Sequence, residues 1–320
     1  MSTLILNSWD VKNLLRMPDV IEAVENAFIE LGENKVSMPP KSYLVVEDGD
    51  FRAMPAAISG AAGMKWVNVH LKNKEKNLPS IMAILVLNDP ETGYPLAIMD
   101  ATEITAYRTA AASAIASKHL ARKDSTSLGI IGAGHQADTH IMAHLELFNF
   151  KIIKIYDRSK TAQNRLISSF TDYTLTECSV EEVAASDIVC TLTPSRSPVL
   201  KHSWIKTGTH INAVGADAKG KQELEPSILN KAMVIVDNLE QASAAGEINV
   251  PISKGTFKPN QVYATLSEII IGKKRGRIDD RAITIFDSTG IAIEDIATAK
   301  LLYEKALKRP KDRYTSLDLV

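Results

Sequence analysis

The chain contains only two cysteines, Cys178 and Cys190, and this scarcity excludes two classes of protein. One possible disulfide cannot be the framework of a chain of 320 residues, and two cysteines are too few for a metal site made of cysteine alone. Low cysteine content is also typical of proteins that work in a reducing compartment. We therefore expect a cytoplasmic protein without a disulfide scaffold.

A surplus of charge and a long apolar run are missing as well. Lysine and arginine number 37 against 38 aspartates and glutamates, so the net charge of −1 creates no field that would gather nucleic acid or anionic lipid. No uninterrupted apolar run approaches the roughly 18 residues of a membrane span, and the first residues lack the pattern of a signal peptide. We expect neither a nucleic-acid nor a membrane partner.

The hydrophobic pattern predicts two kinds of structure along the chain. An early helix is expected from Asp19, which together with Glu22 has the spacing of a capping box, and residues 36–100 consist of short apolar segments separated by turn residues. From about residue 127 to 290, short apolar runs alternate with helical patterns, which is typical of a parallel sheet with helices on both faces. A last helix is expected over residues 292–307. The predicted class is α/β.

A glycine-rich motif follows the first of these apolar runs. Gly132-Ala-Gly-His-Gln-Ala137 comes directly after Ile131 and precedes a helical segment, as in the Gly-x-Gly-x-x-Ala dinucleotide fingerprint. In that fingerprint the first glycine allows the tight turn, the second lets the backbone approach a pyrophosphate, and the helix N-terminus binds the phosphates. Asp157 ends the next run about 20 residues later, where a carboxylate binds the ribose 2′-hydroxyl. The sequence predicts a nicotinamide cofactor in a Rossmann domain.

The choice between NAD and NADP rests on two adjacent residues. Asp157 favours NAD because a carboxylate repels a 2′-phosphate, whereas Arg158 could bind that phosphate, so NADP is not excluded. Two other features have two interpretations each. Ser288 either reaches the nicotinamide or, like Thr289, caps the last helix. His140 and His144 have the spacing of a zinc pair, but without a following glutamate we interpret them as packed or solvated side chains, and we expect no metal.

Ten ordered motifs resemble the ornithine cyclodeaminase and mu-crystallin family, and within it the archaeal-type alanine dehydrogenases. They begin at Met38-Pro-Pro-Lys, Arg52-Ala-Met-Pro, Gly63-Met-Lys-Trp-Val-Asn, Pro90-Glu-Thr-Gly, Tyr107-Arg-Thr-Ala, Gly132-Ala-Gly, Asn212-Ala-Val-Gly-Ala-Asp, Gly220-Lys-Gln-Glu-Leu, Gly246-Glu-Ile-Asn and Phe286-Asp-Ser-Thr-Gly. The resemblance implies a doubly wound Rossmann sheet beside a discontinuous mixed-sheet α+β domain, and a homodimer. The expected domains are 1–118 for substrate binding and dimerisation, 119–290 for NAD binding, and 291–320 as a C-terminal helix returning to the first domain.

The resemblance also implies the site residues. It places the carboxylate of an amino or oxo acid substrate on Lys41, Lys65 and Arg108, makes Lys65 the proton donor and acceptor, and assigns the substrate amine and water to Asp217. Burial of Lys65 between apolar neighbours should lower its pKa towards neutrality. The residues expected to bind the cofactor are Arg108, Thr109, Gly132, Gly134, His135, Gln136, Asp157, Arg158, Thr193, Gly215, Ala216, Asp217 and Ser288.

The implied activity is NAD-dependent oxidative deamination of L-alanine to pyruvate and ammonia. Cyclodeaminases carry a glutamate two residues before the Met-Pro pair to bind a distal amine, whereas this chain has Arg52, which would repel it and could assist with the carboxylate of pyruvate. Ornithine cyclodeaminase, a cyclic imine reductase and a non-catalytic binding protein of the mu-crystallin type stay open as alternatives. Lys219 replaces the family's usual proline stretch near Asp217.

Overall fold

The chain folds into two compact units in a computed structural model that describes residues 2–310 and 312–319. Unit 1 comprises the residues up to Arg108 and those from Ile291 onward, and unit 2 comprises Thr109–Gly290. The expected boundary at residue 118 lies near the end of helix α3 (Thr102–Leu120), whereas the units divide within that helix. The α/β class, with one parallel and one mixed sheet, is confirmed.

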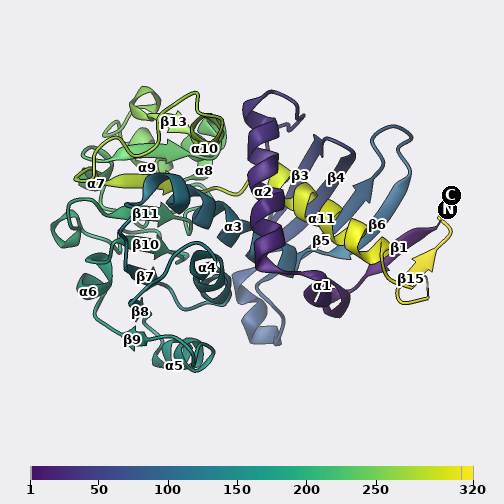
Figure 1. Ribbon diagram of the computed structural model, residues 1–320, viewed down its shortest axis with the longest axis horizontal. Helices are drawn as coiled ribbons and strands as arrows, with labels where there is room; N and C mark the ends of the chain where they lie inside the picture. The colour runs from purple at the N-terminus through teal and green to yellow at the C-terminus, as the bar shows by residue number, and fades with distance from the viewer. Residues whose placement is uncertain (1, 311, 320) are drawn as a thin grey trace. The chain divides into compact units, whose positions relative to one another are not determined.

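Unit 1 is built on a mixed sheet in which all neighbouring strands are antiparallel except β1 and β6. The strands, in sheet order, are β15 (Thr315–Leu317), β1 (Thr3–Leu6), β6 (Pro95–Asp100), β5 (Ile81–Asn88), β4 (Ala61–Val69), β3 (Gly49–Ile58) and β2 (Ser42–Val46). The helical segments are α1 (Ser8–Leu14), α2 (Met17–Gly32), the 3-10 turn Leu71–Lys76 and α11 (Ala292–Leu307). Because α11 packs against α2, β3 and β4, the last part of the chain completes the core of the first part (Figure 1).

Helix α2 begins earlier than the sequence suggested. The expected N-cap, Asp19, lies inside the helix, which starts at Met17 after Arg16 and carries Pro18 in its first turn. Proline suits that position because its missing N–H has no partner in a helix's first turn and its fixed φ is already helical. The capping-box prediction was therefore wrong, and the proline marks the true start.

Unit 2 is a doubly wound parallel sheet. Its strands, in sheet order, are β13 (Ala264–Thr265), β12 (Met233–Val236), β14 (Thr284–Asp287), β11 (His210–Ala213), β10 (Ile188–Thr191), β7 (Ser127–Ile131), β8 (Ile152–Tyr156) and β9 (Leu175–Glu177). Its helical segments besides most of α3 are α4 (His135–Leu145), α5 (Lys160–Ser168), α6 (Val180–Ala184), α7 (Pro226–Leu229), α8 (Leu239–Ala245), α9 (Asn249–Ser253), α10 (Leu266–Ile270) and the 3-10 turns His202–Trp204 and Pro259–Gln261. None of the helices in the described part of the chain is long and apolar enough to cross a bilayer.

Both faces of the parallel sheet are buried. In strand β10, Val189 belongs to one hydrophobic cluster, while its neighbours Ile188 and Cys190 belong to a second one. Successive side chains of a strand point to opposite faces, so these two clusters are the cores on the two sides of the sheet. This double burial explains why the strands are continuous apolar runs without alternation.

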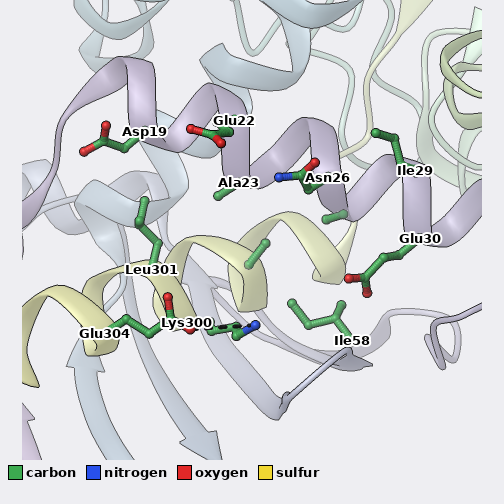
Figure 2. A pocket seen from close by; sticks show the side chains of 12 residues that line it. Asp19, Glu22, Ala23, Asn26, Ile29, Glu30, Ile58, Lys300, Leu301 and Glu304 are labelled. Carbon is green, nitrogen blue, oxygen red and sulfur yellow. Dashed lines mark ion pairs between the residues drawn. The ribbon is translucent and has the colours of Figure 1, made fainter.

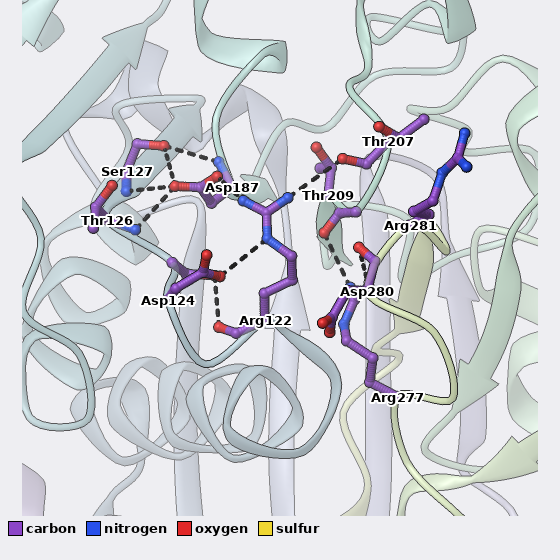
Figure 3. Close-up of polar contacts among 12 residues, drawn as sticks. Arg122, Asp124, Thr126, Ser127, Asp187, Thr207, Thr209, Arg277, Asp280 and Arg281 are labelled. Carbon is purple, nitrogen blue, oxygen red and sulfur yellow. Dashed lines mark hydrogen bonds and ion pairs between the residues drawn. The ribbon is translucent and has the colours of Figure 1, made fainter.

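The loops at the amino ends of these strands are held by arginine side chains (Figure 3). Arg122 pairs with Asp187, whose second carboxylate oxygen accepts from the backbone N–H groups of Thr126 and Ser127. The nearby Arg277 donates to the backbone carbonyls of Leu120, Gly208 and Ala282. Arg277 belongs to the basic segment Lys273-Lys-Arg-Gly-Arg, whose composition is typical of a solvated turn. Its side chain instead links the end of α3 to the loops that contain Gly208 and Ala282.

Candidate functional site

Unit 1 contains a buried cluster of two cations and two carboxylates. Lys65 lies on β4 opposite Met54 of β3 and Leu85 of β5, both of which are buried, so its side chain is on the covered face of the mixed sheet and only 1% exposed. Its Nζ donates to Asp295 Oδ1 at 2.7 Å and to Thr105 Oγ1 at 3.2 Å. A lysine this deeply buried is rare without a carboxylate partner.

Arg108 completes the cluster from helix α3. Its Nε donates to the same Asp295 oxygen at 2.9 Å, and its Nη1 donates to Glu294 Oε2 at 2.7 Å. Both carboxylates lie in the first turn of α11 and are fully buried. Removal from water penalises all four charges, so the mutual pairing is what makes their burial tolerable.

The electrostatics of the cluster differ between its two cations. Burial, together with the positive charge of Arg108, lowers the pKa of Lys65 to about 7, although Asp295 acts in the opposite direction. Burial also acts to lower the pKa of Arg108, but Asp295 and Glu294 outweigh it and raise that pKa. Lys65 can therefore exchange a proton near neutral pH while Arg108 stays charged, as proton-transfer catalysis requires.

The remaining basic residues expected at the substrate occupy the same unit. Lys41 follows the isolated bridge of Ser37 with Ala57, and its charge contributes to lowering the pKa of Lys65. Arg52 of β3 is buried, pairs with Asp50 at 2.7 Å and lies 5.4 Å above the ring of Tyr43.

Unit 1 also has a groove of about 510 Å³ between α2 and α11, shown in Figure 2. Its lining contains none of the residues of the cluster and carries four carboxylates, from Asp19, Glu22, Glu30 and Glu304, with Lys300 beside them. This concentration of negative charge would repel the carboxylate of an amino or oxo acid. The groove is therefore not the candidate substrate site.

In unit 2, the fingerprint Gly132–Ala137 forms the turn from β7 into α4. Gly132 has φ of +105°, and a side chain there would also press against Leu192 O, so only glycine suits this position. Gly134 has an ordinary φ of −76°, and a Cβ built on it meets no described atom within 4 Å. Neither packing nor backbone strain explains this second glycine, and the open space beside it is wide enough for a group to approach the backbone.

The acidic residue of the fingerprint lies beside the glycine turn. Asp157 accepts from the backbone N–H of Ala133 through Oδ2 and from that of Ser159 through Oδ1, both at 2.7 Å. Arg158 and His135 are exposed, and Gln136 is half-buried. The turn, the helix N-terminus and the carboxylate are thus close together, as a dinucleotide requires.

The carboxyl ends of β10, β11 and β14 carry the other residues expected at the cofactor. Thr193 and Gly215 are bound by one buried carboxylate, that of Glu223, which accepts from both of their backbone N–H groups. Ser288 follows β14 with a buried Oγ that has no hydrogen-bond partner among the described residues. It does not cap α11, which begins after Ile291, and Thr289 instead donates to Asp237. The capping interpretation was therefore wrong for both residues.

Asp217 is half-buried and pairs with Lys221, four residues further on. The lysine singled out in the sequence, Lys219, is exposed instead. Buried Ala216 and Thr109 belong to this unit as well. Lys65 and Arg108 thus share one oxygen of Asp295, while the fingerprint, Asp157, Thr193, Gly215, Asp217 and Ser288 form the candidate cofactor edge of unit 2.

Three buried carboxylates behind this edge were missed by sequence reasoning. Glu247 accepts from the backbone N–H groups of Glu223 and Leu224, and Asp287 accepts from those of Glu247 and Ile248. Each carboxylate therefore fixes the backbone of the next, ending at Glu223 and the loops it holds. Burial raises the pKa of Asp287 to about 8. The signal was present, because all three lie in motifs that carry the family resemblance.

The histidines of α4 are packed within unit 2. Nδ1 of His140 lies 2.8 Å from Gln136 O, and its Nε2 lies 3.2 Å from Ser113 Oγ of α3. Nδ1 of His144 likewise contacts His140 O, and its Nε2 contacts Ser117 Oγ. Across the described ranges, no group of three histidine, cysteine or acidic side chains is placed to hold a metal ion.

The chain combines a discontinuous unit, built on a mixed sheet, with a doubly wound unit that carries a dinucleotide fingerprint. These features define a class of proteins that bind a nicotinamide dinucleotide. The sequence matches the ornithine cyclodeaminase/mu-crystallin family over residues 1–310, and the chain belongs to that family. It is 50% identical to alanine dehydrogenase of Archaeoglobus fulgidus over 311 residues, which are 97% of each chain.

Two solved structures are similar over nearly the full length. An archaeal alanine dehydrogenase dimer with bound NAD has a TM-score of 0.98 and 48% identity, with all of both chains covered. The Δ1-pyrroline-2-carboxylate reductase of Thermococcus litoralis, in complex with NADH and L-proline, has a TM-score of 0.93 and 40% identity, covering 96% of this chain and 98% of that one.

Proposed function

We propose that this protein is an NAD-dependent alanine dehydrogenase, which interconverts L-alanine and water with pyruvate and ammonia. The observation that carries the proposal is the buried Lys65–Arg108 cluster, with a lysine whose pKa of about 7 suits proton transfer. The 50% identity to an alanine dehydrogenase over 97% of both chains supports the substrate. Membership of the family and the dinucleotide fold make the chain an oxidoreductase acting on the CH–NH₂ group of an amino acid.

NAD would be bound along the carboxyl edge of the parallel sheet. The phosphates would lie over Gly132 and Gly134 at the N-terminus of α4, and Asp157 would accept from a ribose hydroxyl. His135, Gln136 and Arg158 would border this part, and Thr109, Thr193, Gly215, Ala216 and the unpartnered Ser288 Oγ would line the rest. When bound, NAD supplies the acceptor for the hydride that leaves the α-carbon of alanine.

Unit 1 would supply the cations that bind the substrate carboxylate and the lysine that exchanges a proton with the substrate. Arg108 would bind the carboxylate, with Lys41 and Arg52 adding positive charge, and this would orient the α-carbon for reaction. Nζ of Lys65 would accept a proton as the substrate loses it and return it in the reverse direction. Asp217 would bind the amino group and the attacking water.

A second candidate is reduction of a cyclic imine. The 40% identity and TM-score of 0.93 to a pyrroline-2-carboxylate reductase favour it specifically. A cyclic imino acid also carries a carboxylate beside a carbon–nitrogen bond, so the same cations and the same lysine serve both substrates. Ornithine cyclisation has less support, because Arg52 occupies the position from which a carboxylate would have to bind a distal ammonium.

We also propose that the protein forms a homodimer through the mixed sheet. The sheet face opposite Lys65 carries exposed apolar side chains on three strands, namely Leu44 of β2, Met64 of β4, and Met82 and Ile84 of β5. Exposed apolar side chains gathered on one face of a sheet are typical of an interaction surface. A second copy is the occupant we favour because a relative of 48% identity is described as a dimer.

The first test is absorbance of the reduced nicotinamide after mixing the protein with L-alanine and NAD. We expect net NADH formation that requires alanine, and Lys65→Ala should lower kcat by about 100-fold or more, because general acid–base catalysis contributes that much. Absence of NADH with alanine, together with NADH consumption on a cyclic imino acid, would replace the proposal by its second candidate. Lys35→Ala, at an exposed lysine of the same unit, serves as the control and should retain activity.

A further inference from the structure

The geometry points to Asp295 and Glu294 as positioning residues for the two cations of the proposed substrate site. Asp295 holds the ammonium of Lys65 and the guanidinium of Arg108 on one oxygen, and Glu294 holds the other side of that guanidinium. This inference rests on the proposed function, because it assigns how the lysine and arginine of that site are oriented and charged.

Three contacts converge on these two residues. The two carboxylates accept three charged hydrogen bonds of 2.7–2.9 Å from Lys65 and Arg108, and all four residues are at least 95% buried. Charge-assisted bonds in this distance range are the strong class of hydrogen bonds. Neighbouring residues of one helix turn thereby determine where both cations lie.

The charges of the cluster balance. With Lys65 protonated, Lys65 and Arg108 carry two positive charges and Asp295 and Glu294 carry two negative charges, so the four groups are neutral before substrate binds. The other charged group acting on Lys65 is Lys41. Removing the Asp295 charge would take away the carboxylate that contacts Lys65 and leave the like charges of Arg108 and Lys41 acting on it, while Glu294 stays paired with Arg108. Since like charges disfavour protonation, the Lys65 ammonium would then lose its proton at lower pH.

Asp295 also presents an acceptor that none of the described residues uses. Asp295 Oδ2 is buried and has no hydrogen-bond partner among the residues that the structure describes. A buried carboxylate oxygen without a partner is costly, and such groups are rare in folded proteins. Because Oδ2 belongs to the carboxylate that binds Lys65, an amino group or water brought to that lysine would find an acceptor there.

The test compares Asp295→Asn with Glu294→Gln, two substitutions that keep side-chain shape and remove one charge each. In the Asp295 variant we expect the acid limb of kcat/KM for alanine oxidation to move down by about one pH unit or more, because a contacting opposite charge has effects of that size. In the Glu294 variant, which loses a contact to Arg108 and none to Lys65, the limb should stay and KM for pyruvate should change. Equal shifts in both variants, or none in either, would overturn the inference.

A second readout does not depend on catalysis. The difference in unfolding free energy between the protein and its Lys65→Met variant should be constant below the Lys65 pKa and increase with pH above it, because the unfolded lysine holds its proton up to about pH 10.4. We call the pH at which this difference starts to increase the break. The break is expected near pH 7, and about one pH unit or more lower when the Asp295→Asn substitution is also present. If the break moves although alanine is not oxidised, the proposed substrate is wrong and the positioning role stands.

The charge removal itself could prevent folding, since breaking a buried ion pair is costly. Asp295→Glu then serves as the second variant, because it keeps the charge and displaces the oxygens by one methylene group. We expect its break to stay near pH 7 while kcat falls by about tenfold or more, consistent with a misplaced catalytic group. Full activity of this variant would contradict the positioning role.

Discussion

Asp157 shows how a single carboxylate can fix the fold and still offer acceptors to a ligand. Its two oxygens accept from the backbone N–H groups of Ala133 and Ser159, and they thereby fix the glycine turn against the loop after β8. A carboxylate has about four acceptor positions, so two hydrogen bonds leave room for ribose hydroxyls. The same negative charge disfavours a 2′-phosphate at this position.

Asp157→Asn should therefore shift cofactor preference towards NADP. The amide keeps one acceptor and removes the charge, so we expect the ratio of kcat/KM for NAD to that for NADP to fall by about tenfold, equivalent to roughly 1.4 kcal/mol. Steady-state kinetics with both cofactors measures it. Adding Arg158→Ala to this variant should lower NADP use again if the arginine binds the phosphate, and an unchanged ratio in Asp157→Asn would exclude the electrostatic explanation.

At the scale of single residues, the sequence identified charged side chains whose neighbours along the chain indicate burial. It missed charged side chains whose binding partners lie far away in the sequence. Lys65 was predictable because its apolar neighbours in β4 indicate burial. Asp295 and Glu294 were not, because acidic residues in the first turn of a helix are ordinary, and their partners lie 230 and 186 residues away in the sequence. The role of Arg277 could not be predicted for the same reason, because nothing in its basic segment indicates the backbone carbonyls that it binds.

At the level of secondary-structure elements, long apolar segments were predicted well and short ones were not. The runs at 127–131 and 152–156 match β7 and β8, and the segment 292–307 matches α11. The edge strands β9 and β13, three and two residues long, have no apolar run, because their pairing partner determines them.

The turn between β7 and α4 allows a test that separates binding from folding. Gly134→Ala should leave the melting temperature within a few degrees of the parent, because its φ is ordinary and the new methyl group contacts no described atom. We expect the Kd for NAD to increase by about tenfold or more, because the methyl group would occupy the space of the pyrophosphate. Calorimetric titration and thermal unfolding measure the two effects.

A matched glycine lies in the preceding strand. At Gly129 of β7 a Cβ would lie 2.5 Å from Val183 O, so Gly129→Ala should lower the melting temperature. If Gly134→Ala binds NAD like the parent protein, the empty space above that glycine has another purpose than a phosphate.

Across the whole molecule, buried histidines connect the sheet of unit 2 with its helices. His140 and His144 of α4 contact serines of α3, and His144 also lies beside Asn212 of β11. His210 of β11 contacts Thr284 of the neighbouring strand and Asn212 of its own strand. Burial lowers the pKa of His140 to about 3, with the neighbouring His144 adding to the shift. The folded protein therefore holds this histidine neutral at a pH where the unfolded chain protonates it.

His140→Gln should reveal this linkage as a change of stability with pH. The unfolded pKa is about 6.5 and the folded pKa lies below it, so histidine loses stability as the pH falls below 6.5, whereas glutamine does not. We expect the parent protein's advantage in unfolding free energy to shrink by about 1.4 kcal/mol per pH unit between pH 6 and 4. Chemical denaturation at several pH values measures it.

Ser113→Ala is the control for this experiment, because it removes the same hydrogen bond and leaves the titrating ring in place. Its difference from the parent protein should stay nearly constant over this pH range. A pH-independent difference for His140→Gln would mean that the ring is protonated or neutral equally in both states.

The division of unit 1 into two chain segments has a consequence for protein synthesis. Lys65 leaves the ribosome 230 residues before Asp295, and Arg108 leaves it 187 residues before that carboxylate. At roughly 5–20 residues per second, the interval is on the order of ten to fifty seconds. Throughout that time the two cations have no α11 to neutralise them, whereas unit 2 is continuous and emerges complete. The nascent chain therefore finishes its parallel sheet first, and the mixed sheet closes over its charges only when the last helix arrives.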